Sequence, residues 1–276
     1  MAYNLKPAKQ EAVIRCLVEG TSVRATERIT GVHRDTVLRL MVRVGSGCEA
    51  LRDEYVRNLS CERIQLDEIW GFVGKKQKQV KDEDDERRVG DFWTFVAIDA
   101  ETKLVPSYLV GKRDGETAQA FVNDLASRLY HRTQLSTDGL KAYLKSIDEA
   151  FGHNVDYAQI VKFYEAVPPG AGRYSPPKVM RTRKTIIIGH PDPEHISTSY
   201  IERQNLTMRM SMRRLTRLTN AFSKKVENLV AAVSLHFGYY NFVRRHMTLK
   251  TAPAVAAGVL AEPWTMSEFV EMALQA

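Results

Sequence analysis

The sequence predicts an α/β protein, in which helices flank a mixed five-stranded sheet and a small all-α domain precedes it. Three observations lead to this prediction. Residues 7–45 place apolar side chains at helical spacing in three short segments, the last two joined by a Gly-containing turn. Residues 63–110 hold three strand-like runs in succession, and helical and strand patterns alternate from residue 117. Two long helical patterns then cover residues 199–218 and 223–243.

Residues 1–45 are predicted to fold as a helix-turn-helix domain. Pro7 suits the first position of a helix, and Gly20 suits its end. A second short helix would end at Ile29, and a third would run from His33 to Val44 after the turn at Thr30-Gly31. A plain helical bundle would produce the same pattern, so the residues alone leave that alternative open.

The start of the third helix carries the candidate DNA contacts of this domain. In a helix-turn-helix protein that part of the chain enters the major groove, where Arg can contact guanine with two hydrogen bonds. Thr and His side chains can contact bases or phosphates. The predicted DNA-binding residues are His33, Arg34, Thr36 and Arg39.

Residues 46–59 are predicted to form a linker that begins at Ser46-Gly47 and turns helical over 49–58. Three strands follow as a meander, over 63–74, 92–99 and 104–110, because these runs are rich in β-branched and aromatic residues. Residues 75–90 between the first two strands are almost all charged. They are expected to form an exposed hairpin loop.

The second half of the sheet is predicted from alternating patterns. Their residue ranges are a helix over 117–130, a strand over 134–137, a helix over 140–151, a strand over 155–161, an irregular Pro/Gly-rich segment over 168–177 and a short apolar run over 186–188. Three antiparallel strands followed by this alternation match an RNase H-like domain over residues 60–250, with a C-terminal tail over 251–276. In such a sheet the first and fourth strands are neighbours.

The charge distribution favours a polyanionic partner. The chain carries 40 Lys and Arg against 33 Asp and Glu, a formal net charge of +7. Residues 1–45 carry a net +4 and residues 202–250 a net +8, whereas the middle of the chain is close to neutral. Solvated helical faces would explain any one of these runs, but two basic segments around a neutral middle favour nucleic acid.

Other sequence features exclude several classes of protein. The three cysteines form no Cys-x-x-Cys pair, so neither a zinc ribbon nor a disulfide framework is expected. The first residues lack the apolar core of a signal peptide, and no run of 18 apolar residues predicts a membrane helix. A cytoplasmic protein associated with nucleic acid, without a membrane partner, is the expectation.

Three carboxylates occupy suggestive positions in the predicted fold. Asp67 lies in the first strand, Asp138 ends the fourth, and Glu202 lies in the first turn of the long helix. Converging carboxylates repel one another unless divalent cations neutralise them, and oxygen ligands of this kind favour Mg²⁺ or Mn²⁺. With 33 acidic residues the chain offers many such triples, so the spacing alone does not single this one out.

Five sequence blocks carry a resemblance to a known family. They are Leu66–Val73, Ala97–Val105, Ser136–Tyr143, Tyr200–Asn205 and Phe222–Glu227. In this order they resemble bacterial insertion-sequence transposases, and most closely the IS-one family of DDE enzymes. The resemblance extends from the helix-turn-helix segment to about Gly258. Many members also carry a zinc-binding Cys cluster before the helix-turn-helix, and its absence here fits a shorter branch or a truncated copy.

The resemblance implies roles for individual residues. Asp67, Asp138 and Glu202 match the family's catalytic triad and would bind two Mg²⁺ (or Mn²⁺) ions. Glu68 adjoins Asp67, but neighbours on a strand point to opposite faces, so only one of the two is expected to reach the site. Asn205, Arg209 and Arg213 extend the face of the helix that carries Glu202 and are expected to contact DNA.

The function implied is that of a DNA transposase that cleaves transposon ends and joins them to target DNA. Its partner would be double-stranded DNA, and joining two ends would need a homo-oligomer on that DNA. One alternative is an RNase H-like nuclease without strand transfer. A second is a helix-turn-helix regulator on an inactive scaffold, which would bind DNA without cleaving it. A third is a purely structural basic protein, which sequence-specific DNA binding would exclude.

Overall fold

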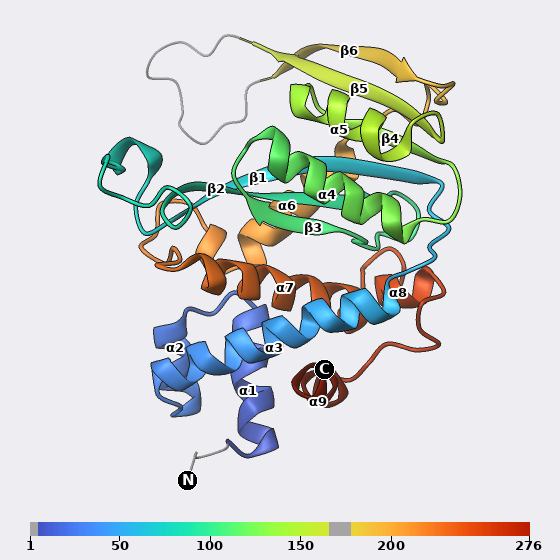
Figure 1. The fold of residues 1–276 in the computed structure, drawn as a ribbon. Helices are drawn as coiled ribbons and strands as arrows, with labels where there is room; N and C mark the ends of the chain where they lie inside the picture. Colours follow the sequence, from blue (N-terminus) through green and yellow to red (C-terminus); the bar gives the residue numbers. More distant parts are fainter. Residues whose placement is uncertain (1–4, 166–177) are drawn as a thin grey trace.

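The computed structural model describes residues 5–165 and 178–276, so the predicted irregular segment 168–177 lies outside the described residues. Its centre is one mixed sheet of six strands in the order β3-β2-β1-β4-β5-β6 (Figure 1). The strands are β1 (Arg63–Val73), β2 (Gly90–Asp99), β3 (Tyr108–Gly111), β4 (Thr133–Thr137), β5 (Val155–Tyr164) and β6 (Val179–Ile188).

The directions of the strands follow from the connections between them. β1, β2 and β3 form an antiparallel meander, as predicted. β4 lies parallel to β1, and β5 lies parallel to β4, because a helix crosses over between β4 and β5. β6 returns antiparallel along β5 and forms one edge of the sheet. The predicted neighbourhood of the first and fourth strands is therefore confirmed.

Helices cover both faces of this sheet. α4 (Gly115–Arg128) and α5 (Lys141–Phe151) lie on one face, where the side chains of Leu66 and Phe95 are fully buried. α6 (Ser199–Ser211) and α7 (Val226–Phe242) lie on the other, against Ile69 and Val96. Alternate residues of β1 thus enter two separate apolar clusters, which fixes the register of this central strand.

The prediction of five strands is wrong, because β6 adds a sixth. The sequence analysis detected only the apolar run at its end, residues 186–188. Nine of the ten β6 residues are exposed, so neither face of the strand carries a continuous apolar pattern. The strand is held by its pairing with β5 instead. No hydrophobic period exists in that segment from which it could be predicted.

The N-terminal helices are α1 (Pro7–Val18), α2 (Val23–Thr30) and α3 (Arg34–Tyr55). The first two match the prediction, but α3 continues through the segment expected to be a linker. Gly45 and Gly47 lie inside α3, and a Cβ atom at either position would overlap the backbone of Ala231 in α7 or of Ala273 in the C-terminal helix α9 (Met266–Gln275). These glycines therefore permit close helix packing and do not mark a flexible joint.

The remaining elements are short or C-terminal. The predicted helix over 199–218 ends at Ser211 and is followed by a 3-10 turn, η2 (Arg213–Leu215); a second such turn, η1 (Gln77–Gln79), lies in the charged β1–β2 loop. The predicted tail contains α8 (Pro253–Ala256) and α9 (Met266–Gln275), whose Phe269 is fully buried. Among the described residues, no helix combines the length and apolarity needed to cross a membrane.

A buried arginine joins α3 to the sheet domain. Arg128 at the end of α4 has no exposed surface. Its guanidinium donates to both carboxylate oxygens of Asp124, at 3.0 and 2.7 Å, and to Asp53 Oδ1 at 2.5 Å. It also donates to the carbonyl of Val56 at 3.0 Å, just beyond the end of α3. The charge is thus matched by carboxylates and by a helix terminus.

We expect Arg128→Met to lower the free energy of unfolding by about 3–5 kcal/mol, because the substitution leaves the Asp124 carboxylate without its buried partner. Urea denaturation followed by circular dichroism measures this loss. Arg57→Met is the control, since Arg57 pairs with the same Asp53 but is 40% exposed. Its effect should be far smaller. Equal losses in the two variants would contradict the structural role of Arg128.

Candidate active site

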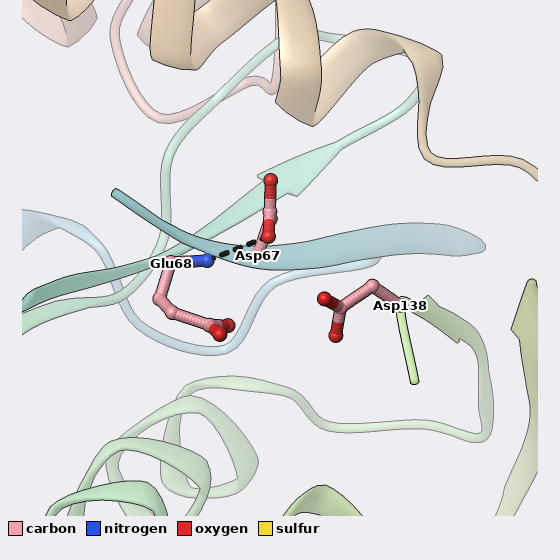
Figure 2. A group of neighbouring side chains, drawn as sticks. All are labelled: Asp67, Glu68 and Asp138. Carbon is pink, nitrogen blue, oxygen red and sulfur yellow. Dashed lines mark hydrogen bonds between the residues drawn. The ribbon is translucent and has the colours of Figure 1, made fainter. Parts of the chain in front are cut away.

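Two predicted catalytic carboxylates meet at the centre of the sheet. In the parallel pairing of β1 with β4, Leu66 lies opposite Thr137. Asp67 is the next residue of β1, and Asp138 is the first residue after β4, so the register places them side by side. Figure 2 shows Asp138 just past the end of β4, with its carboxylate turned towards β1. Leu140 donates its backbone N–H to Asp138 Oδ1 at 2.9 Å and holds this turn.

Glu68 joins the other two carboxylates. One oxygen from each of Asp67, Glu68 and Asp138 lies within 4.8 Å of the others. The expectation that only one of the neighbouring pair reaches the site is therefore wrong. Asp67 and Glu68 do leave β1 on opposite sides, but the longer Glu68 side chain bends back towards Asp138 (Figure 2). Strand alternation sets the direction of Cβ and not the reach of a carboxylate two bonds further on.

The close carboxylates disfavour one another's charge. Burial raises the pKa of Asp67 to about 7, and the charges of Glu68, Asp138 and Glu202 add to this effect. Burial and Asp138 also raise the pKa of Glu68, although Arg113 partly opposes them. Arg113 donates to Glu68 Oε1 from Nε at 2.8 Å and from Nη2 at 2.6 Å. Glu68 is thus partly neutralised by the protein itself, whereas Asp67 has no cationic partner among the described residues.

Glu202 lies near the cluster but outside it. Its carboxylate accepts a hydrogen bond from Thr198 Oγ1 at 2.7 Å and forms an ion pair with Lys162 of β5. The structure therefore brings together Asp67, Asp138 and Glu68, with Glu202 close enough to raise the pKa of Asp67. The role of Glu202 as third catalytic carboxylate stays a prediction.

Gln65 fixes the helix that carries Glu202. Its buried side-chain oxygen accepts the backbone N–H groups of Tyr200 at 2.8 Å and Ile201 at 3.1 Å, the free donors of the first turn of α6. Gln65 and Asp67 are two residues apart on β1 and therefore face the same side of the sheet. One strand thus supplies both a carboxylate and the anchor for the opposing helix. The two-residue spacing was the sequence signal that could have identified Gln65.

The donor set fits a divalent cation. Carboxylate oxygens are the ligands that Mg²⁺ and Mn²⁺ prefer. Burial is the main cause of the raised pKa of Asp67, and a cation would neutralise the charges of Glu68, Asp138 and Glu202 that add to it. Asn205 adds a further oxygen. Its Nδ2 donates to Asp67 Oδ2 at 2.8 Å, whereas its buried Oδ1 has no hydrogen-bond partner among the described residues. Asp67, Glu68 and Asp138 are the carboxylates close enough together to hold a cation, and Asn205 holds Asp67 in place beside them.

The predicted DNA-binding residues fall into two groups. His33, Arg34 and Arg39 are exposed at the start of α3, and Thr36 accepts a hydrogen bond from Arg39 Nη2 at 3.2 Å. His33 also caps α3, because its Nδ1 accepts the backbone N–H of Asp35 at 3.3 Å.

The second group lies on and after α6. Asn205 points inward to Asp67, and Arg209 is half-buried and donates to the carbonyl of Leu215 at 3.3 Å. Arg213 is exposed on η2. Asn205 and Arg209 thus have partners within the protein, and Arg213 alone of the three presents an exposed side chain. Contacts of all seven residues with DNA stay predictions.

Comparison with known proteins gives matches in structure alone. No family model matches the chain, and no curated protein matches its sequence. A solved piggyBac transposase synaptic complex with hairpin DNA is similar over 97% of this chain and 69% of its own, with 9% identity and a TM-score of 0.43. A Mos1 transposase paired-end complex with the left transposon end covers 57% of this chain, with 14% identity and a TM-score of 0.23. The matched part spans 59% of that Mos1 chain. Similarities of this size do not establish a shared function.

Proposed function

We propose that this chain is a DDE-type DNA transposase, which cleaves DNA at transposon ends and transfers the freed strand into target DNA in a metal-dependent reaction. The observation that carries the proposal is the meeting of Asp67 and Asp138 across the β1–β4 register, with Glu202 on the helix anchored beside them. These three residues lie in three of the five blocks that resemble IS-one transposases. Membership of that family and the helix-turn-helix domain over residues 1–45 are parts of the same proposal.

The residues of the site would act by binding divalent cations at fixed positions beside the DNA. Two Mg²⁺ or Mn²⁺ ions bound there would supply the activation of water and the stabilisation of the leaving oxygen that phosphodiester cleavage requires. Asp67, Asp138 and Glu202 would be the ligands, and Asn205 would hold Asp67 in orientation through its 2.8 Å hydrogen bond. Gln65 would keep α6 at a constant distance from β1.

Two phosphoryl transfers follow from this proposal. In the first, water attacks the phosphodiester at the transposon end, the P–O bond to the 3′ oxygen breaks, and a 3′-hydroxyl and a 5′-phosphate are released. In the second, that 3′-hydroxyl attacks a target phosphodiester, and the target's own 3′ oxygen leaves with a proton. Neither step requires a covalent bond between protein and DNA. A homo-oligomer would bring two ends together.

A strand-transfer assay tests the proposed function. Purified protein is incubated with labelled DNA carrying the sequences that flank its coding region, with a plasmid target and with Mg²⁺ or Mn²⁺. We expect the label to become joined to the plasmid in the presence of the metal ion, and we expect no joined product when EDTA is added. Cut DNA without joined product would replace the proposal with a nuclease. Sequence-specific binding without any metal-dependent product would replace it with a DNA-binding regulator on an inactive scaffold.

A further inference from the structure

A groove separates the N-terminal helices from the segment between α6 and α7. Its volume is about 1030 Å³. One wall is formed by the end of α1, the start of α2 and the first half of α3. The other is formed by residues 211–225 and by the side of α7. Neither wall belongs to the carboxylate site.

The groove is strongly basic. Six cationic side chains line it against one acidic side chain, Asp35; the cations are Arg24, Arg34, Arg213, Arg214, Lys224 and Lys225. Elsewhere many cations are paired, as Arg113 is with Glu68 and Lys162 with Glu202. Within residues 5–165 and 178–276, no carboxylate lies within 4.0 Å of any of these six cations. Their charge is therefore available to an external anion.

Two polar side chains that line the groove, Arg214 and His236, are half-buried or buried. Arg214 is half-buried, and its guanidinium donates to Ser223 Oγ at 2.9 Å and to Met41 Sδ at 3.3 Å. Burial lowers its pKa to about 10, so it still carries its charge at neutral pH. His236 on α7 is only 3% exposed, and neither of its ring nitrogens has a hydrogen-bond partner in the described part of the chain. Arg214 can therefore offer a charged donor to an incoming anion, whereas burial lowers the pKa of His236 to about 3 and keeps its ring neutral.

The floor between these cations is apolar. Leu38, Met41, Met212 and Leu235 all line the groove, and the last three are buried. Six cations spread over two walls match a repeating anion better than a single small one, and an apolar floor matches the sugar that joins successive phosphates. Arg213 is separated from the end of α6, the helix that carries Glu202, by Met212 alone. One helix, α6, thus connects the groove to the carboxylate site.

We propose that this groove holds the sugar–phosphate backbone of a DNA duplex and clamps it between the N-terminal helices and the 211–225 segment. The inference rests on the proposed function for its partner, DNA, but assigns a binding site that is separate from the carboxylates. The contacts are to phosphates, so they supply affinity without reading sequence. Base contacts from the start of α3 would add specificity.

The test measures binding of a fluorescent duplex of arbitrary sequence by anisotropy, in EDTA so that no DNA is cut. Removing two phosphate contacts should weaken binding. It should also reduce the slope of the logarithm of the binding constant against the logarithm of the salt concentration by about two. We expect Lys224→Gln/Lys225→Gln to raise the Kd by roughly tenfold at moderate salt and Arg214→Gln by several-fold. The control Arg57→Gln/Lys145→Gln removes the same net charge from side chains that are 40% and 80% exposed on other elements. Its Kd should stay within about twofold of the wild-type value.

A second measurement does not depend on variants. Lysine acetylation of the wild-type protein is followed by mass spectrometry with duplex DNA, with inorganic phosphate or with neither. DNA alone should protect Lys224 and Lys225, whereas Lys145 should react equally in all three samples. Protection by millimolar phosphate to the same extent would show a small-anion site and overturn the proposal. Protection by neither ligand would overturn it too.

The groove and the proposed function can fail separately. A wild-type protein that fails the strand-transfer assay but loses duplex binding in the groove variants would refute the transposase and keep the clamp. Joined product together with unchanged binding in Lys224→Gln/Lys225→Gln and Arg214→Gln would refute the clamp and keep the transposase.

Discussion

Replacing Asp138 by Asn should abolish both cleavage and strand transfer, by at least ~10³-fold, which corresponds to about 4 kcal/mol of lost transition-state stabilisation. Asn has nearly the same shape, so the turn after β4 should survive through the bond from Leu140 to the remaining side-chain oxygen. The charge that holds a cation opposite Asp67 is lost. Product formation by the variant and by the wild-type protein on one labelled substrate measures the effect.

Two further variants identify the third carboxylate. Glu202→Gln should reduce product formation as severely as Asp138→Asn, because the proposal assigns a ligand role to Glu202. Glu68→Gln should retain more activity, since the Glu68 carboxylate is already engaged by Arg113 at 2.6 Å. The opposite ranking, in variants with equal thermal stability, would make Glu68 the ligand and Glu202 a structural partner of Lys162.

Replacing Asp67 by Asn should stabilise the metal-free protein at pH 8 while it destroys activity. Burial raises the pKa of the folded-state Asp67 to about 7 from an ordinary 3.8. Between those values the unfolded chain has released this proton and the folded chain still holds it, so the free energy of unfolding falls as pH rises from about 4 to about 7. A pKa shift of about three units lowers the free energy of unfolding of the wild-type protein by on the order of 4 kcal/mol at pH 8. The Asp67→Asn variant has no proton to release at this position and does not lose this stability.

Urea denaturation in EDTA at pH 5 and pH 8 measures this difference. The variant should be the more stable protein at both pH values, and its advantage at pH 5 should be only about a third of its advantage at pH 8, because pH 5 lies part-way between the unfolded and folded pKa values of Asp67. Mg²⁺ should raise the stability of the wild-type protein at pH 8, less so below pH 6, where protons compete for Asp67. It should leave the Asn variant unchanged. A variant that is less stable than the wild-type protein at pH 8 would show that the charge of Asp67 does not destabilise the folded protein.

The strand neighbours could be predicted from the sequence because they depend on element order. Three consecutive strands followed by a helical crossover allow few arrangements, and the observed β1–β4 pairing brings Asp67 beside Asp138 as expected. The involvement of Glu68 could not be predicted in this way. Whether its carboxylate bends towards Asp138 or away depends on Arg113 and Tyr143, which lie 45 and 75 residues further along the chain.

Errors at two other places share one cause, which is that the deciding contact is absent from the local pattern. The glycines at 45 and 47 resemble a linker, yet α7 and α9 approach so closely there that only glycine fits within the helix. The edge strand β6 shows no apolar period because its residues are exposed on both faces. In both cases a distant partner, and not the segment's own sequence, selects the conformation. The division of the chain into domains at residue 45 stays a prediction.

The uninterrupted α3 has a mechanical consequence under the proposed function. A helix of 22 residues is roughly 33 Å long, close to one turn of the double helix. Its first turn carries the residues proposed to read DNA, and its far end is locked to α4 by Arg128. A continuous helix of this kind holds its two ends in a fixed orientation relative to each other. The proposed DNA-binding residues and the carboxylate site would therefore stay at a constant separation and in a constant orientation. The protein would then cut DNA at a fixed number of base pairs from the sequence that it binds.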